Sequence, residues 1–95
     1  MNRIDEMGRV LLPKKTRGLL DWEKGDKIEL SPNVNEKSLS VKLASDNSEN
    51  QYEIDDLSRI KIPSTILEML GWGYANALEH TVIESDSSIS MMKVA

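Results

Sequence analysis

The chain has 95 residues with no cysteine and one histidine, and its 16 Asp and Glu outnumber its 12 Lys and Arg, so that the formal net charge is −4 at pH 7. The absence of cysteine excludes disulfides and thiolate metal sites, and the lone His80 does not make a metal cluster by itself. The proportions of hydrophobic (39%) and charged (29%) residues are typical of a folded protein, and no apolar run approaches the roughly 18 residues of a membrane span. Since no signal-peptide pattern opens the chain either, we expect a cytoplasmic protein that does not contact the membrane.

The chain begins with two short extended segments. Residues 3–5 are predicted to be extended, Met7-Gly8 marks a turn, and residues 10–12 form an aliphatic strand. Pro13 follows at once. It ends the strand and suits the first turn of a helix, where its missing N–H costs nothing.

The helix predicted after Pro13 has an apolar face made of Thr16, Leu19 and Leu20, although Gly18 weakens it. Trp22 comes just past the helix end, where a hydrophobic residue commonly folds back onto the last turn, so we expect it in the core.

A β-hairpin is predicted next. A turn at Gly25-Asp26 leads into a strand at 27–30, and residues 33–36 form a turn-rich break. The strand at 38–43 alternates polar and apolar residues, as a strand with one buried face should.

Residues 44–51 are polar and without periodicity, which indicates a linker, and beyond them the first part of the chain is repeated at a spacing of 50 residues. The segment IDEMGRVLLP at 4–13 returns as IDDLSRIKIP at 54–63. The shared register continues over roughly forty residues, which indicates a tandem duplication with a first half at 1–43 and a second half at 52–95.

In the second half, the helix has the apolar residues Ile66, Leu67, Met69 and Leu70, with Gly71 as a left-handed C-terminal cap. Trp72 repeats Trp22 as a core residue, and His80 lies on the apolar phase of its strand, which favours a packing role over a ligand role.

Each half has about 44 residues, which is near the lower limit for a chain that buries its own core without a disulfide, a metal or a partner. We therefore expect the two halves to fold together as one compact domain. The linker can span at most roughly 26–29 Å, which is enough to cross a small domain.

The segment IDEMGRVLLP and the following EKGDKIEL at 23–30 resemble the AbrB/MazE/SpoVT swapped-hairpin family, and both halves match this pattern. The resemblance implies a mostly β fold with two short helices, a swapped-hairpin β-barrel formed here as a single-chain pseudo-dimer. MraZ-type proteins, which are longer, also hold two such units and rank second. The resemblance further implies binding to double-stranded DNA through Arg9, Arg17 and Arg59, with Arg3 nearby.

Local charge adds Lys14 and Lys15 to these candidates. Residues 1–43 hold nine Lys and Arg against seven Asp and Glu, a charge of +2, whereas residues 44–95 hold three against nine, a charge of −6. In the second half, Leu67 and Glu68 stand where Arg17 and Gly18 stand in the first. We therefore expect DNA contact mainly through the first half.

Arg9 and Arg59 also have an architectural interpretation. Each follows an Asp by four residues across a turn, so each can pair with Asp5 or Asp55 or hold the turn through backbone carbonyls. The survival of the pattern in the acidic second half favours at least a partly architectural role.

The leading hypothesis is a DNA-binding transcriptional regulator. The alternative is an antitoxin that binds a toxin protein and its own promoter; members with that role typically use an extended tail after the barrel, and only three residues follow the last predicted strand. A third hypothesis is self-association between the acidic half of one chain and the basic half of another. The sequence contains no nucleophile–base pair, glycine-rich phosphate loop or metal-ligand spacing, so we expect neither an enzyme nor a cofactor.

Overall fold

The computed structural model describes residues 2–45 and 50–94, which form a mostly β protein with two short helices. The helices are α1 (Lys14–Leu20) and α2 (Ser64–Leu70), and a 3-10 turn covers Glu84–Asp86. The strands are β1 (Asn2–Arg3), β2 (Arg9–Leu11), β3 (Lys27–Asn33), β4 (Ser38–Leu43), β5 (Tyr52–Glu53), β6 (Arg59–Lys61), β7 (Ala77–Ile83) and β8 (Ser88–Lys93). Within the described residues, no helix is long and apolar enough to cross a membrane.

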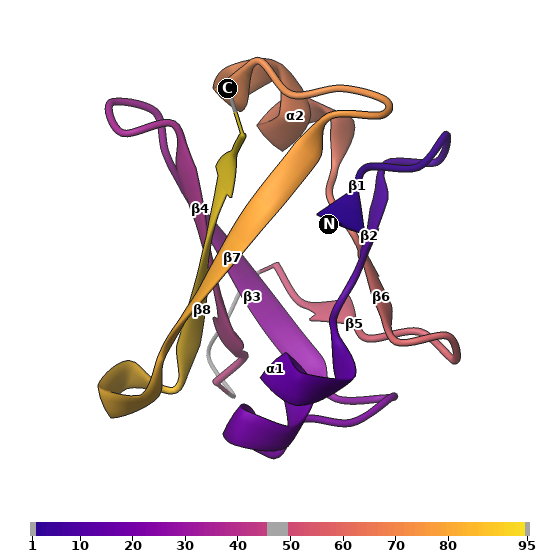
Figure 1. Ribbon diagram of the computed structural model, residues 1–95, viewed down its shortest axis with the longest axis vertical. Coiled ribbons are helices and arrows are strands. Elements are labelled where there is room, and N and C mark those ends of the chain that lie inside the picture. Colours follow the sequence, from indigo (N-terminus) through magenta and orange to yellow (C-terminus); the bar gives the residue numbers. More distant parts are fainter. Residues whose placement is uncertain (1, 46–49, 95) are drawn as a thin grey trace.

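Six strands form one antiparallel sheet in the order β1-β7-β8-β4-β3-β5, and β2 pairs with β6 in a separate two-stranded ribbon. Strands β1, β2, β3 and β4 of the first half correspond to β5, β6, β7 and β8 of the second. Exchanging each strand for its counterpart gives the same strand order, read from the opposite edge of the sheet. Figure 1 shows the ribbon on one side of the molecule, the crossing strands of the larger half-barrel sheet on the other, and α1 and α2 at opposite ends. The duplication is therefore visible as an internal pseudo-twofold relation.

The two halves meet where equivalent strands pair with each other across the pseudo-twofold axis. Ser40 of β4 lies opposite Ser90 of β8, and Val10 of β2 lies opposite Ile60 of β6. The edge strands also cross between halves, because β1 pairs with β7 and β5 pairs with β3. Both halves thus contribute to one sheet and one ribbon.

The turn of each half lies against the start of the other half's helix. Leu12 N donates to Ser58 O at 2.8 Å, and Ile62 N donates to Gly8 O at 2.9 Å. The turn of the first half, at Gly8, therefore lies beside the start of α2, and the turn of the second half, at Ser58, lies beside the start of α1.

One hydrophobic core takes residues from both halves. Val10 and Ile60 are fully buried at the centre of the ribbon, and the two tryptophans are 4% and 6% exposed, as predicted. Gly71 ends α2 in the left-handed conformation predicted for it, with φ of 69°.

Some predicted boundaries were wrong. The first extended segment is Asn2–Arg3 rather than 3–5, because the carboxylate of Asp5 is drawn into the turn that follows. The ribbon strand runs over Arg9–Leu11 rather than 10–12, and β3 continues to Asn33 because its pairing with β4 extends that far.

Leu19 and Met69 were predicted on the apolar helix face, but they are 51% and 48% exposed. Each helix has seven residues, and the residue before the last, three positions after the buried Thr16 or Ile66, turns away from the core. The buried face is therefore narrower than the sequence pattern indicated.

Candidate functional site

The outer face of the ribbon carries three cationic side chains. Since Val10 and Ile60 point into the core, the residues on either side of them in each strand point outward. Arg9 lies opposite Lys61, and Leu11 lies opposite Arg59. Lys61 was not identified from the sequence. It lies between the buried Ile60 and Ile62, and the alternation of side chains along a strand could have predicted that it points outward.

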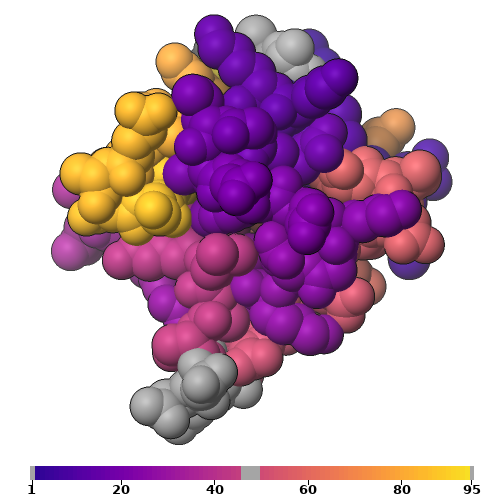
Figure 2. Space-filling model, turned by 90° about the horizontal axis from the view of Figure 1, so that it is seen from below, coloured from indigo at the N-terminus to yellow at the C-terminus, as the bar shows by residue number. Residues whose placement is uncertain are grey.

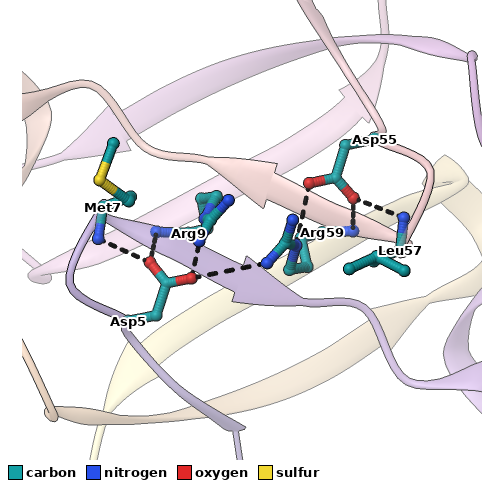
Figure 3. Close-up of polar contacts among 6 residues, drawn as sticks. All are labelled: Asp5, Met7, Arg9, Asp55, Leu57 and Arg59. Atoms are coloured by element: carbon teal, nitrogen blue, oxygen red, sulfur yellow. Dashed lines mark hydrogen bonds and ion pairs between the residues drawn. The ribbon is translucent and has the colours of Figure 1, made fainter.

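The arginine of the first half is held by a carboxylate. Asp5 Oδ1 accepts hydrogen bonds from the backbone N–H groups of Met7 (2.9 Å) and Arg9 (2.8 Å), and Asp5 Oδ2 accepts one from Arg9 Nε at 2.8 Å (Figure 3). The three bonds close the turn between β1 and β2. We call this arrangement, together with its equivalent in the second half, the Asp–Arg brace.

The second half repeats the brace almost unchanged. Asp55 accepts from the N–H groups of Leu57 (2.9 Å) and Arg59 (2.8 Å) and from Arg59 Nε at 3.0 Å. Arg59 Nη1 also lies 4.0 Å from Asp5 Oδ2, so the two braces meet across the ribbon (Figure 3). The architectural interpretation of both arginines is consistent with this geometry.

The braces keep both carboxyls ionised. Burial raises the pKa of Asp5, but the hydrogen bonds from the Arg9 and Met7 amides and the Arg9 guanidinium outweigh it, so the pKa lies below its ordinary value of 3.8. The pKa of Asp55 is lowered in the same way by Arg59 and Leu57 against the effect of burial.

The hydrogen bonds of the braces leave part of each arginine side chain exposed. The Nε atoms bind the aspartates, while the side chains stay 32% (Arg9) and 26% (Arg59) exposed. Each guanidinium therefore remains partly accessible to a further acceptor at the surface, although Arg59 Nη1 also faces Asp5 Oδ2. Within residues 2–45 and 50–94, Lys61 has no hydrogen-bond or ion-pair partner, and it stands directly opposite another cation.

The remaining predicted cations lie near one end of the ribbon or away from it. Lys14 and Lys15 are exposed at the start of α1, and Arg17 is half-buried with Nε donating to Leu12 O at 3.0 Å. Figure 2 shows α1 as a large part of one end of the molecular surface, next to the second half's chain. Arg3 is separate, since its Nη1 donates to Ala75 O at 2.9 Å, just before β7 begins.

The equivalent surface at α2 is not cationic. Ser64, Thr65 and Glu68 are exposed there, and Leu67 is half-buried against the core. Leu67 also lines a cavity of about 650 Å³ with Met7, Gly8 and Lys61. The exposed residues of the two helices therefore differ in charge although the helices have the same length.

Among the described residues, no group of three or more His, Cys, Asp or Glu side chains is placed to hold a metal ion.

No family model matches the chain, and no curated protein matches it. Among solved structures, it is similar to the solution structure of PHS018 from Pyrococcus horikoshii, with a TM-score of 0.53 and 15% sequence identity. The match covers 99% of this chain and 85% of that one. At this level of identity the likeness concerns the fold alone.

Proposed function

We propose that the protein is a cytoplasmic, DNA-binding transcriptional regulator of the AbrB-like type rather than an enzyme. In this proposal the fold is a swapped-hairpin β-barrel in which one chain forms the pseudo-dimer. The observation that carries it is the outer face of the ribbon, where Arg9, Arg59 and Lys61 stand together within one pair of three-residue strands.

The outer face of the ribbon has more positive than negative charge. Arg9 and Lys61 are like charges directly opposite each other in an antiparallel pair, an arrangement that destabilises a sheet when nothing lies between them. Asp5 offsets the charge of Arg9, and Lys61 is left unpaired among the described residues. A phosphate of double-stranded DNA would supply the missing negative charge.

The neighbouring surfaces favour an asymmetric complex. Lys14 and Lys15 extend the positive charge from the ribbon onto α1, whereas Glu68 lies on α2. We therefore expect DNA to lie across the ribbon and to make more phosphate contacts at the α1 end.

The test is fluorescence anisotropy with a duplex DNA pool at several salt concentrations. We expect a salt-dependent complex, and each lost phosphate contact should reduce the log–log salt slope by about 0.9. Lys61→Gln and Lys14→Ser remove charge from exposed side chains that are not part of a brace, so the fold should be retained. Their melting temperatures should match the parent protein.

Lys37→Ser is the matched control. It removes one charge in the β3–β4 turn, on the side of the molecule away from the ribbon (Figure 1), and it introduces the residue found at the equivalent position 87. Both positions have similar left-handed φ angles, 53° and 51°. A loss from Lys37→Ser equal to that from Lys61→Gln, or no salt-sensitive complex at micromolar protein, would contradict the proposal.

The antitoxin role stays the alternative prediction. A protein that acts through a toxin alone would give no DNA complex in this assay, whereas one that also represses its own promoter would bind that promoter in preference to the pool.

A further inference from the structure

The two helices dock on the sheet through different chemistry. α2 packs on β3 of the other half, where Ile66 belongs to the core and Leu30 packs against it. The equivalents of these residues are Thr16 on α1 and His80 on β7. The α1 end therefore has polar residues at two positions where the α2 end has apolar ones.

His80 is an unusual residue for that position. Both ring nitrogens are buried, and neither has a hydrogen-bond partner among the described residues. Its strand partner, Met91, is fully buried, so the ring points toward the apolar side of β7. Buried polar groups without partners are rare in folded proteins and destabilise the state that buries them.

A cavity of about 570 Å³ lies beside this ring, between α1 and β7. Its walls come from Pro13 and Thr16 on the helix side and from Leu78, Glu79 and His80 on the strand side, with Asn2 and Val94 completing it. Thr16 is 8% exposed and lines the same cavity as His80. The α1 docking surface is therefore both polar and incompletely packed.

The sequence of α1 weakens the helix further. Gly18 stands at a helix-interior position where α2 has Glu68, and no atom lies within 4 Å of where its Cβ would be, so packing does not require glycine there. Asp21 ends α1 with φ of 58°, a conformation that favours the glycine found at the end of α2. Leu20 is half-buried where Leu70 is 1% exposed.

We propose that His80 acts as a proton-operated latch for α1: the helix stays docked on β7 while the imidazole is neutral and is released when it is protonated. An imidazolium in this position would need an acceptor or a carboxylate. Among the residues that line the cavity, Glu79 alone is charged, and it is exposed, on the opposite phase of its strand from His80. Lys14 and Lys15 are exposed, Arg17 is bonded to Leu12 O, and Arg3 is bonded to Ala75 O, so α1 and β1 offer no anion.

The direction of the pH effect follows from burial. Desolvation lowers the pKa of His80 below its ordinary value of 6.5 in the docked state. The released state binds the proton more readily, so docking weakens as the pH falls from about 6.5 toward the lowered pKa. This window lies above that of Asp5 and Asp55, whose pKa values are below 3.8.

The experiment is amide hydrogen exchange by NMR on the whole chain at about pH 7.5 and about pH 5, with α2 as the internal reference. After correction for intrinsic exchange, α1 amides should lose about tenfold to thirtyfold protection relative to α2 amides, the range set by the proton affinity of a free imidazole. The latch is refuted if α1 and α2 lose protection equally, or if the His80 ring titrates in the native protein at or above its ordinary pKa.

Two variants separate protonation from a general weakness of the helix. Thr16→Ile with His80→Leu introduces the apolar residues found at the equivalent positions of α2 and β3, and it should remove the pH dependence of α1 exchange. His80→Gln keeps a neutral polar side chain that does not titrate, and it should also be insensitive to pH even if α1 is less protected throughout. A pH response of α1 that persists in His80→Gln would overturn the proposal, and none of these measurements depends on DNA binding.

Discussion

The ribbon and the helices have changed very differently since the duplication. In the ribbon, both halves retain an aspartate, an arginine and three hydrogen bonds of nearly equal length. In the helices, Thr16, Arg17 and Gly18 stand where the other half has Ile66, Leu67 and Glu68. Positions whose side chains close a turn have been retained, whereas positions on a helix surface have been free to acquire different charge and packing.

The largest effect expected in this comparison is at the centre of the ribbon. Ile60→Ala removes a fully buried side chain that meets Val10, and a cavity should lower the free energy of unfolding by about 2–5 kcal/mol. Urea unfolding measures this change in the free energy of unfolding. Leu57→Ala, at the 64% exposed tip of the preceding turn, is the control and should change stability little.

The next largest effect tests whether the two braces are equivalent. Asp5→Ala and Asp55→Ala each leave two backbone N–H groups and a guanidinium without their acceptor, so each should lower the free energy of unfolding by about 1–3 kcal/mol. The neighbouring exposed carboxylates serve as controls through Glu6→Ala and Asp56→Ala. A difference above about 1 kcal/mol between the two aspartate variants would show that the braces are not equivalent.

Acid should lower the stability of the protein by protonating the carboxyls of Asp5 and Asp55 in the braces. Because the pKa values of Asp5 and Asp55 are lower in the folded protein than in the unfolded chain, their contribution is complete above 3.8 and is lost as pH falls through the folded values. Urea unfolding at about pH 5.5 and about pH 2.5 should show less loss for the Asp5→Asn/Asp55→Asn double variant than for the parent protein. An equal loss in both would mean that other groups dominate acid unfolding.

The smallest effect sharpens the helix side of the comparison. Gly18→Ala should stabilise the protein by about 0.8–1.0 kcal/mol, since the position is helical, exposed and without neighbours for a Cβ. Thermal unfolding should show a small rise in melting temperature. Gly25→Ala is the contrasting control and should destabilise, because Gly25 has φ of 89°.

Local features of this fold could be predicted from the sequence, and pairings between the halves could not. Pro13 and Pro63 mark the helix starts, and the strand at 38–43 was found at its predicted bounds, because these signals depend on neighbouring residues. The pairing of β4 with β8 joins residues about fifty positions apart, and its register depends on how the two hairpins pack together.

In the candidate site, too, local features could be predicted from the sequence and contacts between the halves could not. The Asp–Arg pattern is visible in the sequence because it spans one turn. Lys61 was missed because its significance comes from Arg9, the residue opposite it in the other half. The exposure of Leu19 likewise depends on how α1 sits on the rest of the molecule.

The crossing strand pairs have a further consequence for how molecules of this protein can associate. Because β4 pairs with β8 and β2 with β6, the first half of one chain can make the same contacts with the second half of another chain. The connection at 44–51 opposes this exchange by holding the two halves of one chain at an effective concentration of the order of millimolar. Shortening this connection should therefore favour a domain-swapped dimer over a self-contained monomer.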